Sequence, residues 1–210
     1  MRIAVLVLAT AAALSAQKLD QLKLHNVKAE SVTFKGKPAV HLTPEPSAQG
    51  EAFAVVTAPE FQLQDGALEI ELAGAPAPGA DTAARGFIGV AFRVQPALDH
   101  FELIYIRPTN GRADDQLRRN HSTQYVSFPD WPWQRLRQET PGVYESYVDL
   151  EPAVWTGIRI TFEGAKARLY VHGASQPVLI VNDLKLPPAK GQIALWVGPG
   201  TDGYFTGLRR

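Results

Sequence analysis

The sequence predicts an all-β protein, an antiparallel β-sandwich of the jelly-roll kind, and three observations lead to this prediction. After its first residues the chain shows almost no helical periodicity, whereas apolar and polar residues alternate in many short segments. About a dozen such segments are separated by glycine, proline and other turn residues. In a chain of 210 residues, antiparallel strands in that number are expected to form one sandwich around one core.

The chain begins with a segment typical of a secretory signal peptide. Arg2 precedes an apolar run over 3–14, and the small residues Ser15 and Ala16 precede a polar stretch. We expect 1–16 to be removed and 17–210 to form a single domain that is periplasmic or secreted in a bacterium. The sequence contains no cysteine, so the core and the sheet hydrogen bonds have to stabilise the exported domain without disulfides.

The predicted strands follow one another at short spacing. Segment 67–73 reads ALEIELA, which places three aliphatic side chains on one face of a strand and two glutamates on the other. Further strands are expected at 31–36, 37–43, 52–57, 86–94, 100–108, 156–164, 167–173, 177–184, 191–200 and 203–209. Gly164-Ala165-Lys166 is typical of a tight hairpin between two of them.

Two segments interrupt the alternation. Residues 73–84 are rich in Pro, Gly and Ala and are expected to form a mobile surface loop. Residues 107–141 form a longer interruption, and their aromatic side chains argue against disorder. We expect this segment to be an ordered excursion over one face of the sandwich.

The stretch 107–133 combines the side chains that recognise sugars. Arginine forks match carboxylates and vicinal hydroxyls, aromatic faces stack on sugar rings, and amides bond to hydroxyls. A structural use stays open, in which arginines pair with Asp114 and Asp115 while Trp131 and Trp133 plug the loop onto the sandwich. Zero formal net charge, with a signal peptide, argues against a nucleic-acid partner.

Four segments together resemble a known family. GFIGVAFRVQ, HFELIYIRPTNGRADDQLRRNHSTQY, WTGIRITFEGAKARLYVHG and GYFTGLR resemble bacterial members of the concanavalin A-like lectin/glucanase superfamily, closest to its laminin G-like and 3-keto-disaccharide hydrolase-like jelly rolls. The resemblance extends over 68–209 and implies two antiparallel sheets, one of them concave, with carbohydrate bound on the concave face or its rim loops. The superfamily holds both enzymes and sugar-binding modules, so the function has to be argued from the site.

The chain departs from the superfamily's glucanases in its acidic residues. Those enzymes carry Glu-x-Asp-x-Glu or Glu-x-Asp-x-x-Glu on one strand, and no segment of this chain has that full spacing. The nearest candidates are Glu69 with Glu71, and Glu145 with Asp149 and Glu151. If the protein is an enzyme, a glycoside hydrolase or lyase, we expect His121 or Glu145 to be its acid–base catalyst, as the hydrolase resemblance implies.

We therefore expect an exported domain that binds a saccharide through its concave face and the 107–133 loop. The residues expected to contact the saccharide are Arg93, Tyr105, Arg107, Asn110, Asn120, Gln124, Trp131 and Trp133, with His121 beside them. The alternatives are a glycoside-cleaving enzyme and a structural or adhesive domain that contacts another protein through its tryptophans.

The arginines favour an acidic or oxidised sugar as the partner, and no segment is long enough to span a membrane. The chain has no phosphate-binding loop, no serine nucleophile elbow and no zinc-ligand spacing, so no cofactor is expected. Calcium bound near Asp202 stays open.

Overall fold

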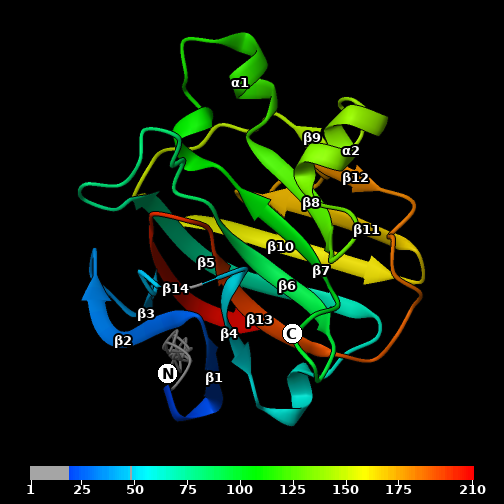
Figure 1. Ribbon diagram of the computed structural model, residues 1–210, viewed down its shortest axis with the longest axis horizontal. Helices are drawn as coiled ribbons and strands as arrows, with labels where there is room; N and C mark the ends of the chain where they lie inside the picture. The colour runs from blue at the N-terminus through cyan, green and yellow to red at the C-terminus, as the bar shows by residue number, and fades with distance from the viewer. Residues whose placement is uncertain (1–18, 48) are drawn as a thin grey trace, which may run out of the picture.

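The structure is a sandwich of two antiparallel seven-stranded sheets (Figure 1). This computed structural model describes residues 19–47 and 49–210, and the expected signal peptide at 1–16 lies outside the described residues. The first sheet, hereafter the concave sheet, has the strand order β1 (Leu22–His25), β4 (Ala52–Val56), β13 (Gln192–Val197), β6 (Ile88–Val94), β7 (Phe101–Ile106), β8 (Thr123–Phe128) and β9 (Glu145–Ser146). The second, the back sheet, has the order β12 (Leu179–Val181), β11 (Lys166–Val171), β10 (Thr156–Glu163), β5 (Gly66–Pro76), β14 (Thr201–Arg209), β3 (Lys37–Pro44) and β2 (Val27–Phe34).

Short helices connect some of the strands. They are the 3-10 turns η1 (Leu19–Gln21), η2 (Pro59–Phe61) and η3 (Pro108–Asn110) and the α-helices α1 (Gln116–Asn120) and α2 (Trp133–Glu139). Within the part of the chain that the structure describes, no helix has the length and apolar character needed to span a membrane.

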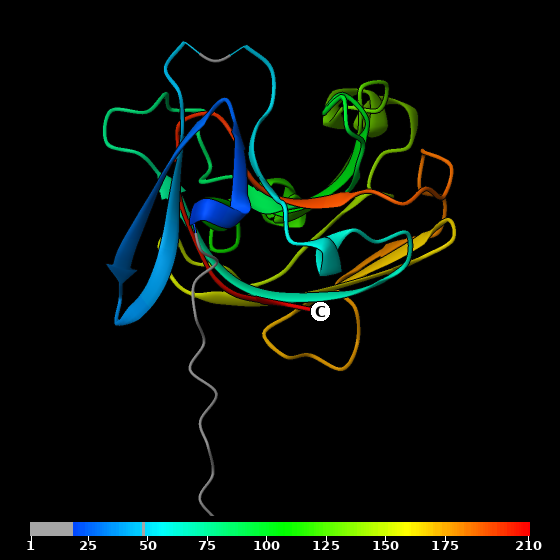
Figure 2. The same ribbon diagram turned by 90° about the horizontal axis from the view of Figure 1, so that it is seen from below.

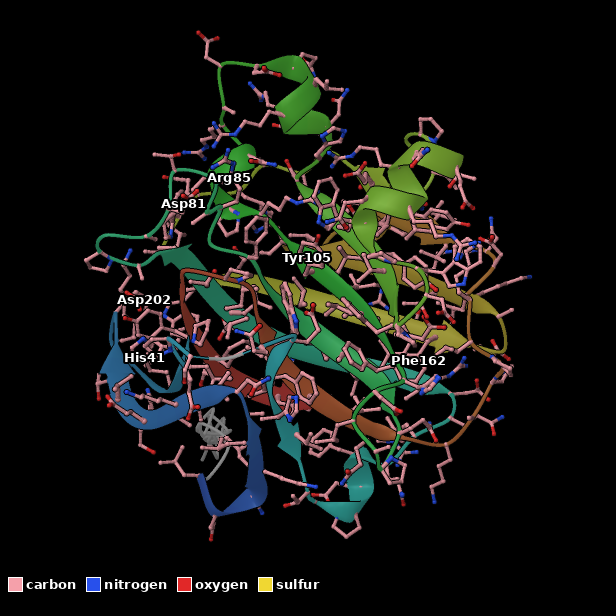
Figure 3. The ribbon with its side chains drawn as sticks, viewed as in Figure 1. His41, Asp81, Arg85, Tyr105, Phe162 and Asp202 are labelled. Carbon is pink, nitrogen blue, oxygen red and sulfur yellow. The ribbon has the colours of Figure 1, made fainter. Side chains whose placement is uncertain are left out.

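The core between the sheets follows from the predicted alternation. On β5, Leu68, Ile70 and Leu72 are buried, while Glu69 and Glu71 point outward from the back sheet and pair with basic side chains. Facing strands of the two sheets meet through aromatic rings: those of Phe92 on β6 and Phe162 on β10 (labelled in Figure 3) stack with centroids 4.6 Å apart. The expected hairpin is also present, because Glu163 pairs with Lys166 around Gly164 and Ala165.

The central strands of the concave sheet bury their side chains on both faces. Figure 2 shows this sheet curling upward, with α2 rising on one side and the segment between β3 and β4 on the other. β6 and β7 are buried at every position, and on the face turned away from the core β7 lines a groove. Sequence alternation is weak in these strands for that reason.

Two predictions about the interruptions are corrected. Residues 73–76 continue β5, so the loop rich in Pro, Gly and Ala begins only after Pro76. The segment 107–141 is no continuous loop, because it contains β8, a strand paired with both β7 and β9. β8 escaped notice because polar residues lie on both of its faces: Thr123 and Ser127 on one and Gln124 on the other, all of them buried.

Candidate functional site

A row of directly paired residues crosses all seven strands of the concave sheet, and its central rings, Trp196 and Tyr105, line a groove. Since side chains at opposed positions of a sheet point to the same face, this row lies on the outer, concave surface. From β1 to β9 it consists of His25, Phe53, Trp196, Gly89, Tyr105, Gln124 and Glu145.

Gly89 shapes the centre of this row. It lies opposite Trp196 on one side and Tyr105 on the other, on strands that are about 10 Å apart. The two rings nevertheless approach to 4.9 Å between centroids, because no side chain separates them over β6. A Cβ at Gly89 would lie 2.3 Å from the carbonyl oxygen of Ile104, so only glycine permits this arrangement.

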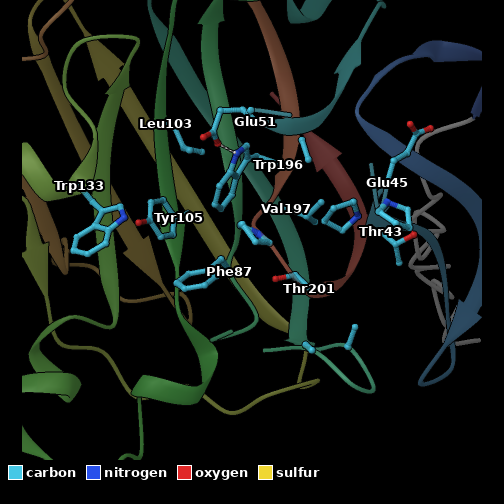
Figure 4. A pocket seen from close by; sticks show the side chains of 18 of the residues that line it. Thr43, Glu45, Glu51, Phe87, Leu103, Tyr105, Trp133, Trp196, Val197 and Thr201 are labelled. Atoms are coloured by element: carbon cyan, nitrogen blue, oxygen red, sulfur yellow. Dashed lines mark hydrogen bonds between the residues drawn. The ribbon is translucent and has the colours of Figure 1, made fainter. Parts of the chain in front are cut away.

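The groove has a volume of about 740 Å³. Figure 4 shows Trp133, Tyr105, Phe87 and Trp196 around it, with Glu51 beside Trp196. Trp133 is the first residue of α2 and is 38% exposed, so its ring is free to contact a ligand. The groove therefore combines apolar ring faces with a small number of polar groups, as ligand sites commonly do.

A buried polar cluster closes the β9 end of the row. The guanidinium of Arg107 donates to Glu145 at 3.0 Å, to Tyr105 Oη at 2.9 Å and to Gln124 Oε1 at 2.8 Å. Arg137, from α2, donates to both oxygens of the same Glu145 carboxylate. This network fixes Tyr105 and ties α2 to the sheet.

The charge of Glu145 is set by these arginines. Burial alone would raise the pKa of Glu145, but the hydrogen bond from Arg137 and the charges of Arg107 and Arg137 outweigh it and hold the pKa below its ordinary value. At neutral pH the side chain is therefore a carboxylate that two guanidiniums already engage.

His121 lies next to this carboxylate, with Nε2 3.5 Å from Glu145 Oε2. Burial lowers the pKa of His121, and the charges of Arg137 and Arg107 lower it further, against the opposing effect of Glu145. The imidazole is therefore neutral at pH 7, where it can accept a proton or a hydrogen bond but carries no charge.

A second hollow of about 740 Å³ adjoins the groove at this end, and Phe87, Trp133, Pro199 and Gly200 line both. The remaining lining includes four arginines and the imidazole, which are Arg85, Arg107, Arg118, Arg137 and His121. Figure 3 shows Arg85 and Asp81 near one another on the same side of Tyr105.

The structure brings most of the predicted contact residues to this region. Tyr105 and Trp133 line the groove, and Arg107, Asn110 and His121 line the adjoining hollow. Gln124 and Glu145 back the site without lining either space, since Gln124 is fully buried and donates to the carbonyl oxygens of Tyr125 and Tyr144.

Three other predicted residues lie away from both spaces. Arg93 is 1% exposed, and its guanidinium donates to the carbonyl oxygens of Gln64 and Gly164 and to Asp65, so it joins the two sheets. Strand alternation from Gly89 would place the Arg93 side chain on the concave face. It points between the sheets instead, because a register shift between β13 and β6 occurs at this point, where Arg93 has a positive φ of 55°.

Asn120 is exposed at the end of α1, where its Oδ1 accepts from Gln116. Trp131 is partly buried against the core, between the cations of Arg135 and Lys185. Trp131 thus packs the segment onto the sandwich, as the structural alternative expected for both tryptophans, whereas Trp133 faces the groove.

The arginine–aspartate pairs considered for the polar segment are not formed with Asp114 and Asp115. Arg112 pairs with Asp149 and Glu151 rather than with Asp114 or Asp115. β9 contains only two residues, so Glu145 does not share a strand with Asp149 and Glu151. The glucanase-like carboxylate triplet is therefore absent from this segment.

Sequence reasoning missed Phe87, Trp196 and Glu51. Trp196 lies in β13, which was correctly predicted, but a strand with two buried faces gives no signal that distinguishes groove from core. Phe87 lies just before β6, which begins at Ile88 and not at residue 86 as expected. Glu51 precedes β4, and its Oε2 accepts from Trp196 Nε1 at 2.7 Å. Burial raises the pKa of Glu51, although the hydrogen bond from Trp196 lowers it in part.

No metal site emerges from the described residues, in which no group of three or more His, Cys, Asp or Glu side chains is placed to hold a metal ion. The carboxylate of Asp202 lies 3.4 Å from His41 Nε2.

Comparison with solved structures defines the class of fold. Three similar structures are the carbohydrate-binding module CBM66 from Bacillus subtilis (TM-score 0.61, 12% identity, covering 90% of this chain and 93% of that chain), the carbohydrate recognition domain of Emp46p (0.51, 13%, 90% and 87%) and the β-glucanase of Bacillus licheniformis (0.51, 12%, 91% and 92%). The protein has the jelly-roll fold of concanavalin A-like lectins and glucanases, as the sequence resemblance predicted. No protein-family model matches the chain, and no curated protein matches it either.

Proposed function

We propose that the protein is an exported saccharide-binding domain whose ligand lies in the concave groove. The observation that carries this proposal is the meeting of Tyr105, Trp196 and Trp133 around one open groove beside fixed polar groups. Aromatic faces provide apolar contact for the C–H faces of sugar rings, and the polar groups provide partners for hydroxyls. The carbohydrate-binding module and the recognition domain among the similar structures support the same ligand class.

Export to the periplasm or the medium rests on the sequence at 1–16. Cleavage near Ala16 leaves a mature chain that begins at Gln17.

The environments of the two predicted catalytic residues, Glu145 and His121, favour a binding function over catalysis. Glu145 is a buried carboxylate engaged by Arg107 and Arg137, so it has no proton to donate at neutral pH and little freedom to attack a substrate. His121 is neutral and lines the hollow, where a hydrogen bond to a hydroxyl suits it. In a binding domain, His121→Ala weakens affinity modestly.

Glycoside cleavage is the second candidate function, and Glu51 is the observation in its favour. Its carboxyl group lies in the groove beside Trp196, and burial raises its pKa, which is the property of a general acid. Under this alternative Glu51, rather than His121 or Glu145, protonates the leaving group.

The adhesive alternative requires two exposed tryptophans. Trp131 is packed between Arg135 and Lys185, so Trp133 alone of this pair is available to a protein partner.

The test is a panel of neutral, acidic and 3-keto oligosaccharides incubated with the mature protein from Gln17, with thermal shift and product release both followed. The proposal predicts shifts without products, and weaker shifts in Trp133→Ala. Products that disappear in Glu51→Gln but persist in Glu60→Gln, an exposed glutamate outside the groove, establish the enzyme instead. The absence of both a thermal shift and a product with every oligosaccharide of the panel contradicts both saccharide binding and glycoside cleavage.

A further inference from the structure

The hollow beside the groove contains more positive charge than its carboxylates neutralise. Arg107 and Arg137 share the single carboxylate of Glu145. Arg85 and Arg118, which also line the hollow, have no carboxylate within ion-pair distance among the described residues. They differ in this respect from Arg112, a neighbour in sequence that pairs with two acids.

Arg118 is held by neutral acceptors. Its Nε donates to Asn110 Oδ1 at 3.0 Å, and its Nη2 donates to the hydroxyl of Thr109 at 3.2 Å. Asn110 is itself buried and fixed by its own donation to the carbonyl oxygen of His121. The guanidinium is therefore pre-oriented, and its Nη1 has no hydrogen bond to any described residue, which leaves it able to donate to a ligand.

Arg85 is positioned in the same way from another segment. Its Nη1 donates to the carbonyl oxygens of Thr82 and Ala84, while Nε and Nη2 make no hydrogen bond within the described chain. Burial lowers the pKa of Arg85, and the charges of Arg118 and Arg107 add to the effect, against a smaller opposing contribution from Asp81. The three guanidiniums thus line one hollow, where their like charges oppose one another.

Each of the two acidic residues that line the hollow accepts a backbone hydrogen bond through one carboxylate oxygen, and neither lies within ion-pair distance of an arginine of the described chain. Asp81 accepts from the amide of Ala83 at 2.7 Å, and Asp115 caps α1 by accepting from the amide of Arg118 at 2.8 Å. Clustered cations with free donors bind carboxylates well, because the guanidinium fork matches the carboxylate geometry and its charge strengthens each hydrogen bond.

We propose that this hollow is a subsite for the carboxylate of a uronic acid residue, with Arg85 and Arg118 as its ligands, at one end of a saccharide that lies along the groove. The subsite rests on the proposed saccharide-binding function and narrows it to acidic sugars. Trp133, which lines both spaces, packs against the chain where it passes from the groove into the hollow.

The test compares uronate oligosaccharides with the same oligosaccharides after their carboxyl groups have been reduced to alcohols, by calorimetric titration of the full mature protein. The wild type is expected to bind the uronate form about a hundredfold more tightly, since two charge-assisted arginine–carboxylate contacts each contribute about tenfold. In about 0.5 M salt this difference in affinity between the uronate and reduced forms is expected to shrink, because salt screens the partly solvent-exposed charges.

Arg118→Gln and Arg85→Gln are each expected to weaken uronate binding about tenfold and to leave binding of the reduced form unchanged. Arg112→Gln, which removes an exposed arginine already paired with acids, is the matched control and changes neither. Because Arg118 also supports η3, the melting temperature of each variant is measured, and Arg85→Gln alone decides the outcome if Arg118→Gln does not fold.

Equal affinity of the wild type for the two forms, or equal weakening of both forms in Arg85→Gln, overturns the subsite while the saccharide-binding function stands. Absence of binding to either form and to the neutral sugars of the panel contradicts the saccharide-binding function itself.

Discussion

Glu145 shows how one residue can resemble a catalyst in the sequence and act as a counter-ion in the structure. Its side chain is 3% exposed and meets Arg107 from the end of β7 and Arg137 from α2. A buried carboxylate between two guanidiniums joins elements that are distant in sequence. Removing one member of such a cluster leaves the other buried charges without a partner. The stability lost in this way is larger than the net stability that the intact cluster provides relative to apolar residues.

Glu145→Gln is therefore expected to lower the free energy of unfolding by about 3 kcal/mol. The control is Glu139→Gln, which removes the exposed partner of Arg135 on α2 and is expected to cost at most about 0.5 kcal/mol. Urea unfolding at pH 7 measures both values. Equal values for the two variants would show that Glu145 does not stabilise the fold through buried ion pairs.

The same variant has a defined pH dependence. The pKa of Glu145 is lowered in the folded state, so its contribution to stability is fully present above the ordinary value of 4.5 and is lost as the pH falls through the folded-state pKa. The stability difference between wild type and Glu145→Gln should therefore be constant from pH 7 to about 5 and shrink at lower pH. A difference that stays unchanged down to pH 3 would contradict this assignment.

The individual residues of the site were only partly predictable. Tyr105, Arg107, Asn110, His121 and Trp133, which sequence proximity and side-chain chemistry had indicated together, line the groove or the adjoining hollow. Whether each of them contacts a ligand is still a prediction. The outward or inward direction of a side chain depends on register and bulges, and the bulge that turned Arg93 away from the groove leaves no mark in the local sequence.

At the scale of elements, the start of α2 places two neighbouring tryptophans in different environments. Trp131 precedes the helix and packs on the sandwich, whereas Trp133 begins the helix and lies at the groove. Pro132 between them is the N-cap of α2 and fixes where the helix starts. Two residues of separation are enough to change the direction of the side chain.

This difference predicts separable effects of two equivalent substitutions. Trp133→Ala should weaken saccharide affinity about tenfold, the loss of one stacked ring, with little change in stability because the ring is exposed. Trp131→Ala should instead lower the free energy of unfolding by about 2 kcal/mol and leave the affinity unchanged. Calorimetric titration and urea unfolding of both variants provide the measurements, and a loss of affinity in Trp131→Ala alone would reverse the assignment.

Strands with one buried face were predicted well, and so were the apolar strands β4, β6, β7 and β13 that are buried on both faces, but β8 was not. β5, β10 and β11 alternate clearly because their outer faces meet solvent. β8 was hidden inside the polar segment, since its pairing with β7 and β9 buries hydroxyl and amide side chains that a sequence pattern assigns to loops.

For the whole molecule, the fold class could be predicted because a dozen short alternating segments leave few alternatives to a sandwich. The concavity could not be derived from the alternation, because it depends on how the concave sheet curls and on α2 and the β3–β4 segment that rise at its borders (Figure 2). The resemblance supplied that expectation. The groove is thus a property of the assembled sheet, to which β4, β7, β8 and β13 each contribute lining residues.

The central claim is that the ligand lies on the concave face, and the indole signals of the four tryptophans test it directly. The measurement is a titration of ¹⁵N-labelled mature protein with the tightest-binding saccharide of the panel, following the Nε1–H resonances. Trp133 and Trp196 should shift, while Trp131, packed beside Lys185, and Trp155, bonded to the carbonyl oxygen of Phe34, should not. A shift of Trp155 with Trp133 and Trp196 unmoved would place the ligand away from the groove and contradict the claim.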